Sequence, residues 1–185
     1  MLRRIDLARA RTPTPSPLAL SLAVTLALAA SACGDPAPRG TPSPGIDFTV
    51  KGVPYHLGTG TVERSGALLK LYLSDQPDTC FAVSFTPVGR MSLLEIDVAP
   101  PASGPNVATV AGGGVATVPA PGQAVATLRT SVQGTILSSI DAAGGTISWT
   151  VNADRSLTID TLDLTFAGTT DGLAAASQTI PPCPP

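Results

Sequence analysis

The chain is poor in residues that usually carry chemistry. It has one histidine, His56, in 185 residues, and two glutamates, Glu63 and Glu95. A zinc site needs several His or Cys ligands, and the acidic residues show no EF-hand spacing. A Ser-His-Asp site needs only one histidine, but no Gly-x-Ser-x-Gly elbow accompanies His56. The sequence therefore predicts no catalytic residue, no metal site and no cofactor, and His56 is interpreted as an ordinary loop residue.

Positive charge is also scarce beyond the first 32 residues. The chain has 11 Lys and Arg and 13 Asp and Glu, of which four arginines and one aspartate precede Cys33. The remaining 7 basic and 12 acidic residues give residues 33–185 a net charge of −5. A nucleic-acid-binding domain needs a basic surface, so the composition argues against that class of partner. It also offers no electrostatic attraction to an anionic membrane.

A long apolar run is missing as well. Residues 18–30 are all small or apolar, but at about 1.5 Å per residue they are too short to cross a hydrocarbon core of about 30 Å. Arginines 3, 4, 9 and 11 precede this run, and Ala30 and Ala32 follow the small-x-small cleavage pattern. Together these features predict an export signal.

The residue at which the signal ends is a cysteine. Cys33 follows Leu28-Ala29-Ala30-Ser31-Ala32 and precedes a stretch rich in Pro and Gly, an arrangement that resembles a bacterial lipoprotein signal. We therefore predict a signal peptide over 1–32, a lipidated Cys33 with a linker over 33–45, and a globular domain over 46–185. Gly34 after the cysteine favours the outer membrane. The alternative is an ordinary secretory signal, cut at the same bond, that leaves Cys33 as a free thiol.

The number of cysteines bears on the same question. The chain has three, Cys33, Cys80 and Cys183, and exported proteins seldom leave a thiol unpaired. If Cys33 carries lipid, Cys80 and Cys183 are left to form a disulfide. The alternative is that Cys80 is a buried thiol in the core.

Most of the remaining chain alternates between apolar and polar residues with a period of two, which is typical of strands. In one segment, Leu157 and Ile159 share a phase that shifts at Leu162 and Leu164, as a β-bulge or a bend would produce. Turn-type clusters such as 141–145 separate the segments. We predict an all-β domain, an antiparallel β-sandwich or, as the alternative, a small β-barrel. The alternating segments are 67–73, 80–85, 91–98, 146–152 and 156–166.

Residues 100–123 differ from the rest because they contain many prolines and glycines and no charge. Two similar strings, Val107-Ala108-Thr109-Val110 and Val115-Ala116-Thr117-Val118, flank a glycine loop. They predict either a hairpin arm or a low-complexity insertion at a tolerant surface loop.

Several short strings of the domain resemble those of a known group of proteins. The strings 67–75 and 78–80, a late Gly145-Thr146-Ile147 strand, Asp163-Leu164-Thr165-Phe166 and Pro182-Cys183 resemble small uncharacterised bacterial lipoproteins with one β domain. The resemblance implies architecture and location, and it agrees with pairing of Cys80 and Cys183. We expect a non-enzymatic envelope module, tethered to a membrane through lipid on Cys33, with a binding or structural role and an unidentified protein as its candidate partner. A small exported hydrolase is the alternative.

Overall fold

The structure is a computed structural model, which describes residues 45–84 and 89–183. The predicted signal peptide, the lipidated Cys33 and nearly all of the linker lie outside the described residues. Within them, no helix is long and apolar enough to cross a membrane.

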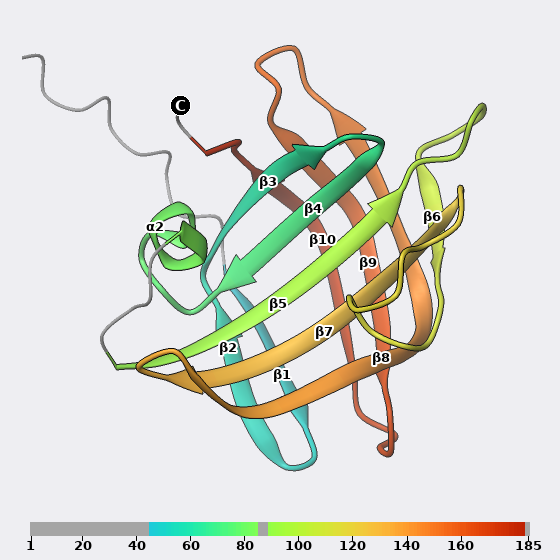
Figure 1. Cartoon of the computed structure of the whole chain (residues 1–185). Coiled ribbons are helices and arrows are strands. Elements are labelled where there is room, and N and C mark those ends of the chain that lie inside the picture. The colour runs from blue at the N-terminus through green and yellow to red at the C-terminus, as the bar shows by residue number, and fades with distance from the viewer. Residues whose placement is uncertain (1–44, 85–88, 184–185) are drawn as a thin grey trace, which may run out of the picture. The chain divides into compact units, whose positions relative to one another are not determined.

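The described residues are mostly β structure with one short helix (Figure 1). The elements are β1 (Ile46–Val50), β2 (Val53–Leu57), β3 (Thr59–Ser65), β4 (Leu68–Ser74), α2 (Thr79–Ser84), β5 (Arg90–Ala99), β6 (Val107–Val110), β7 (Gln123–Val132), β8 (Thr135–Val151), β9 (Leu157–Phe166) and β10 (Gly172–Ile180).

Eight strands form one sheet in the order β10-β9-β8-β6-β7-β5-β4-β3, and β1 and β2 form a separate hairpin. The large sheet curls strongly into a half-barrel (Figure 1). The prediction of a β-rich fold is confirmed. The sandwich is not clearly present, because one curled sheet encloses its own core where two facing layers would be needed.

The core lies on the concave face of this sheet. Leu71, Ile96 and Ile159 are almost completely buried there, and Phe166 stacks on Phe48 of the β1–β2 hairpin with ring centroids 6.1 Å apart. The hairpin thus supplies apolar side chains to the same core. The period-two alternation of the sequence predicted which residues of β4, β5 and β9 face inward, because successive side chains of a strand point to opposite faces of the sheet. On β5 the outward-facing side chains are buried as well.

The predicted bulge in β9 is present. Ser148 of β8 lies opposite Thr161 and Trp149 lies opposite Ile159, so Asp160 is the extra residue. This insertion moves the inward phase from Ile159 to Leu162, as the sequence indicated.

The predicted turn over 141–145 is wrong, because these residues lie inside the long strand β8. Here the register with β9 shifts between Ala142 and Gly144. Gly145 has φ of +137°, and a Cβ on it would clash with the backbone carbonyl of Asp163. The glycines therefore bend one continuous strand, which pairs with β7 before the bend and with β9 after it.

The strand predicted from Cys80 onward is also wrong, because Thr79–Ser84 is the helix α2. The Asp78 carboxylate accepts a hydrogen bond from the Phe81 backbone N–H, and the Asp78 carbonyl accepts one from the Ala82 N–H. Asp78 is therefore an N-cap, whose side chain satisfies a donor that the first helical turn leaves unpaired.

The hairpin arm predicted around residues 111–114 does not form. Val107–Val110 is inserted into the main sheet as β6, between β7 and β8, whereas residues 115–118 form no strand. The Val115 backbone N–H instead donates to the Thr127 hydroxyl of β7. Residues 111–118 thus form a loop attached to the sheet.

Candidate functional site

The two edge strands of the curled sheet meet through the C-terminal segment 181–183, a contact that we call the seam. The Val62 backbone N–H of β3 donates to the Pro181 carbonyl at 3.1 Å, and the Thr61 hydroxyl donates to the same carbonyl at 3.0 Å. The predicted disulfide is confirmed, with Cys80 of α2 bonded to Cys183 and their Cα atoms 5.4 Å apart. The disulfide therefore fixes the seam to the helix.

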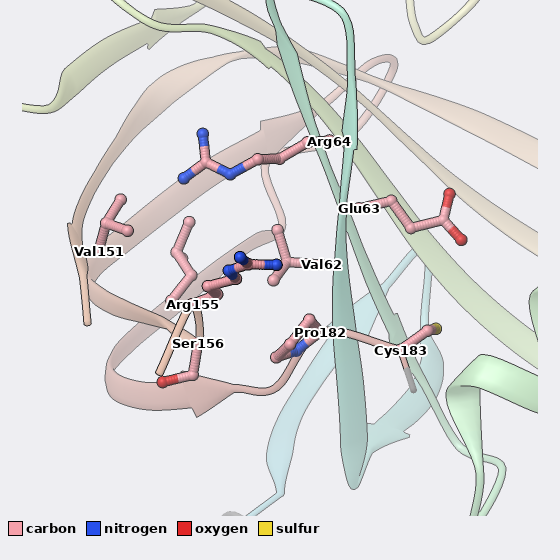
Figure 2. Close-up of a pocket in the computed structure, with 9 residues that line it drawn as sticks. Val62, Glu63, Arg64, Val151, Arg155, Ser156, Pro182 and Cys183 are labelled. Carbon is pink, nitrogen blue, oxygen red and sulfur yellow. The ribbon is translucent and has the colours of Figure 1, made fainter. Parts of the chain in front are cut away.

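An open groove of about 380 Å³ lies beside the seam (Figure 2). It opens where β3 faces the turn between β8 and β9. Its lining residues are Val62, Glu63, Arg64, Val151, Arg155, Ser156, Leu157, Pro182 and Cys183.

The floor of the groove continues the concave face of the sheet. Val62 and Leu157 are buried core residues, and Val151, which pairs with Leu157 across β8 and β9, is 41 % exposed. The alternation over 146–152 puts Val151 on the same face as Ile147 and Trp149, which are buried. The sheet is not covered at this end, so Val151 remains accessible to solvent.

Two arginines lie at the rim of the groove. Arg64 comes two residues after Val62 in β3 and so lies on the core-side face, whereas the intervening Glu63 points away (Figure 2). Arg155 comes from the opposite wall, in the β8–β9 turn. Figure 2 shows both guanidinium groups in the space between the two walls.

The β8–β9 turn is held by its own hydrogen bonds. The Asn152 backbone N–H donates to the Ser156 carbonyl at 2.9 Å, and the Arg155 N–H donates to the Asn152 carbonyl at 3.0 Å. The Asp154 carboxylate accepts from both the backbone N–H and the hydroxyl of Ser156. These two bonds lower the pKa of Asp154, chiefly through the Ser156 hydroxyl.

His56 lies away from the groove and is not in a loop, as predicted, but in strand β2 of the β1–β2 hairpin. Its Nδ1 is 2.7 Å from the Asp47 carboxylate, and the two side chains are 61 % and 80 % exposed. The hairpin brings them together because Asp47 pairs with His56 around the two-residue turn Lys51-Gly52. Both turn residues have positive φ, as a type I′ turn requires.

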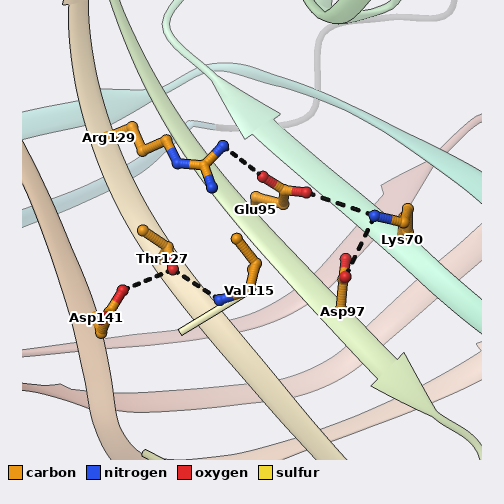
Figure 3. A network of polar contacts seen from close by, with 7 residues as sticks. All are labelled: Lys70, Glu95, Asp97, Val115, Thr127, Arg129 and Asp141. Carbon is orange, nitrogen blue, oxygen red and sulfur yellow. Dashed lines mark hydrogen bonds and ion pairs between the residues drawn. The ribbon is translucent and has the colours of Figure 1, made fainter. Parts of the chain in front are cut away.

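A network of polar groups covers the outer face of the sheet (Figure 3). Arg129 binds Glu95 at 2.9 Å, and Lys70 binds Asp97 at 3.2 Å and Glu95 at 3.7 Å. These cations and carboxylates neutralise one another on neighbouring strands. The network therefore stabilises the register of β4, β5 and β7 and leaves no unpaired cation for a ligand.

Tyr72 lies beside this network on β4. Burial raises its pKa to about 12, and the carboxylates of Glu95, Glu63 and Asp97 add to that effect. The phenol is therefore neutral at physiological pH. The described residues include no group of three or more His, Cys, Asp or Glu side chains that could hold a metal ion.

Sequence reasoning identified Cys80 and Cys183 but missed the groove. Arg64 and Arg155 are separated by 91 positions in the sequence numbering, and no spacing rule joins them. A signal for Arg155 did exist in Asn152-Ala153-Asp154-Arg155, a turn-type cluster between two alternating segments. The contact between Asp47 and His56 could have been found from the Lys51-Gly52 turn.

The chain was also compared with known proteins. No family model, no curated protein and no solved structure matches it, so the role of the groove must be argued from the residues that line it.

Proposed function

We propose that the protein is a non-enzymatic, lipid-anchored module of the bacterial cell envelope that binds a ligand in the groove beside the seam. Lipid on Cys33 would tether it, and Gly34 favours the outer membrane as its location. The resemblance to small bacterial lipoproteins supports this tether.

The groove is the observation that carries the binding role. Its floor is made of the exposed apolar side chains of Val151 and Pro182 beside the buried Val62 and Leu157, and its rim carries two arginines at the end of a concave sheet. Ligand sites commonly combine an apolar surface with a few polar groups and often occupy the mouth of a β-barrel. The rigid sheet and the disulfide would hold this surface open without a ligand.

Site-specific photo-crosslinking in intact envelopes tests the proposal. A photoreactive phenylalanine analogue is placed at Val151, which is in the groove, and separately at Val118, which is 80 % exposed and not in its lining. We expect a specific adduct from position 151 alone, and we expect it to weaken when Arg64→Gln is added. Identical adducts from both positions, or none from position 151, would contradict a binding role for the groove.

The hydrolase alternative has one observation in its favour. His56 and Asp47 are placed as a general base and the carboxylate that orients it. Hydrolysis of a simple ester such as p-nitrophenyl acetate, lost in His56→Ala and retained in Arg155→Gly, would favour this function over the binding module.

A further inference from the structure

The groove has an unusual share of the protein's positive charge. The described residues contain six Lys and Arg, and Lys70 and Arg129 are already engaged in the outer network. Arg64 and Arg155 make no hydrogen bond or ion pair with any other described side chain. Two guanidinium groups without an internal partner therefore face the same groove, from opposite walls, in a protein that is acidic overall.

The position of Arg155 is not one that an arginine would ordinarily occupy. Its φ is +68°, in the left-handed region that glycine adopts easily and that costs about 1–2 kcal/mol for a residue with a Cβ. The hydrogen bonds of the turn hold this conformation, which a three-residue hairpin loop ordinarily places at its last residue. Its effect here is to place a guanidinium group over the groove.

The rest of the lining limits what the arginines can hold. The Ser156 hydroxyl donates its only proton to Asp154, so it cannot donate a hydrogen bond to an anionic ligand. The floor of Val62, Val151, Leu157 and Pro182 is apolar. A compact polyanion such as phosphate would leave some of its oxygens facing this floor without donors, whereas a carboxylate can satisfy both oxygens with guanidinium N–H groups.

We propose that the groove binds a small carboxylic acid with a short apolar body. The carboxylate lies between Arg64 and Arg155, and the apolar part covers Val62, Val151 and Leu157. This inference rests on the proposed function, because it names the class of ligand for the same groove.

The test uses the full chain carrying Cys33→Ser, which changes no described residue and avoids detergent. Hexanoate, its neutral counterpart hexanamide, and inorganic phosphate are titrated while the Nε–Hε signals of ¹⁵N-labelled arginines are followed by NMR. We expect hexanoate to shift the Arg64 and Arg155 signals saturably in the millimolar range. Hexanamide and phosphate should each bind at least about tenfold more weakly, because each lacks one of the two interactions.

Three variants identify the residues involved. Arg64→Gln and Arg155→Gly should each weaken hexanoate binding about tenfold, whereas Arg90→Gln removes the same charge outside the groove and should leave it unchanged. Arg155→Gly also supplies the residue that a φ of +68° favours, so its unfolding midpoint should equal or exceed that of the parent. A loss of binding in this variant therefore cannot come from unfolding.

Other outcomes overturn the inference. Equal binding of hexanamide would show that the arginines do not hold the carboxylate, and equal binding of phosphate would show that the apolar floor contributes nothing. In both cases the groove would still be a binding site, so the proposed function would stand. If no probe shifts any signal of the groove and position 151 gives no crosslink, both proposals fail.

Discussion

At the scale of single residues, some side chains of the described residues stabilise the fold, whereas others are only exposed to solvent. Trp149 is 3 % exposed on the concave face, whereas His56 lies on a hairpin with its ring 61 % exposed. The rarest residue types in the chain therefore have opposite roles. One fills the core, and the other contacts a single exposed carboxylate.

The first prediction compares these two residues. Trp149→Ala should lower the free energy of unfolding by about 3–5 kcal/mol, because it removes a large buried side chain. His56→Ala should change it by about 0.5 kcal/mol or less, since surface substitutions and exposed ion pairs contribute little. Urea denaturation of both variants provides the measurement. If Trp149→Ala left the free energy of unfolding unchanged and His56→Ala lowered it strongly, the roles assigned to the two residues would be wrong.

The second prediction concerns Tyr72. Its pKa is raised from 10.0 to about 12 in the folded state, first by burial and then by neighbouring carboxylates. Below pH 10 the phenol is protonated whether the chain is folded or unfolded, so it contributes no pH dependence. As pH rises from about 10 to about 12, the unfolded chain loses its proton first, and stability falls.

Tyr72→Phe is the control for this effect, because it keeps the ring and removes the titrating group. The unfolding midpoint in urea, measured at pH 8, 10 and 11, should fall less steeply for the variant than for the parent. Tyrosinate absorbance near pH 11 should also show one residue that resists ionisation. Parallel pH profiles for the two proteins would show that Tyr72 titrates normally.

At the scale of elements, the seam depends on a bond between a helix and a terminal segment. Cys80 and Cys183 are separated by 103 residues, and closing so long a loop restricts the unfolded chain strongly. The same bond holds segment 181–183 against β3, where an isolated bridge between Val62 and Pro182 and the hydrogen bond from the Val62 N–H to the Pro181 carbonyl join the two edges.

The third prediction follows from that arrangement. Replacing both cysteines, in Cys80→Ser/Cys183→Ser, should lower the free energy of unfolding by about 2–5 kcal/mol. Hydrogen exchange at the Val62 amide should also become faster, because the Pro181 carbonyl that accepts its hydrogen bond is no longer fixed. Reduction of the parent protein should reproduce both effects. If the doubly substituted chain unfolds at the same urea concentration as the parent, the disulfide does not support the seam.

The strands and the helix differ in how well the sequence predicted them. Alternation identified the inward faces of β4 and β9, including the bulge at Asp160, because a half-buried strand imposes its period on the sequence. It also identified that of β5, which is buried on both faces but carries the paired polar residues Glu95 and Asp97 on the outer one. It failed at α2, where the capping bond of Asp78 outweighs a short β-like pattern. It also failed at Gly145, since a glycine that bends a strand and a glycine that ends one look the same in sequence.

The groove was beyond prediction for a different reason. Arg64 follows a buried valine on an edge strand, and Arg155 belongs to a turn. Each is an ordinary surface residue in its local sequence. Only the curl of the whole sheet brings the two walls together, and curl depends on the summed twist of eight strands.

At the scale of the whole molecule, the proposed function separates into a tether and a domain. The tether is proposed to be lipid on Cys33. The domain carries the groove on a scaffold closed by the disulfide. Because the two parts have no residue in common, each can be tested without changing the other.

The fourth prediction concerns the tether. Wild-type protein should partition into the detergent phase, because each buried CH₂ of an attached acyl chain contributes about 0.8 kcal/mol. Cys33→Ser should instead give a soluble or unprocessed form, whereas Ser43→Ala in the predicted linker should behave as wild type. Phase separation followed by immunoblotting measures the distribution. Identical partitioning of wild type and Cys33→Ser would exclude a lipid anchor at that residue.

The seam also determines when the protein can finish folding. Thr61 and Pro181, which are hydrogen-bonded, are 120 residues apart, and ribosomes add about 5–20 residues per second. The segment that covers the edge of β3 is therefore synthesised about 6–24 s after β3 itself. Wherever the chain folds, this edge exposes unpaired backbone groups to other chains until that segment is in place. Chains truncated before Pro181 retain this exposed edge, so interrupted synthesis yields products that are prone to aggregate.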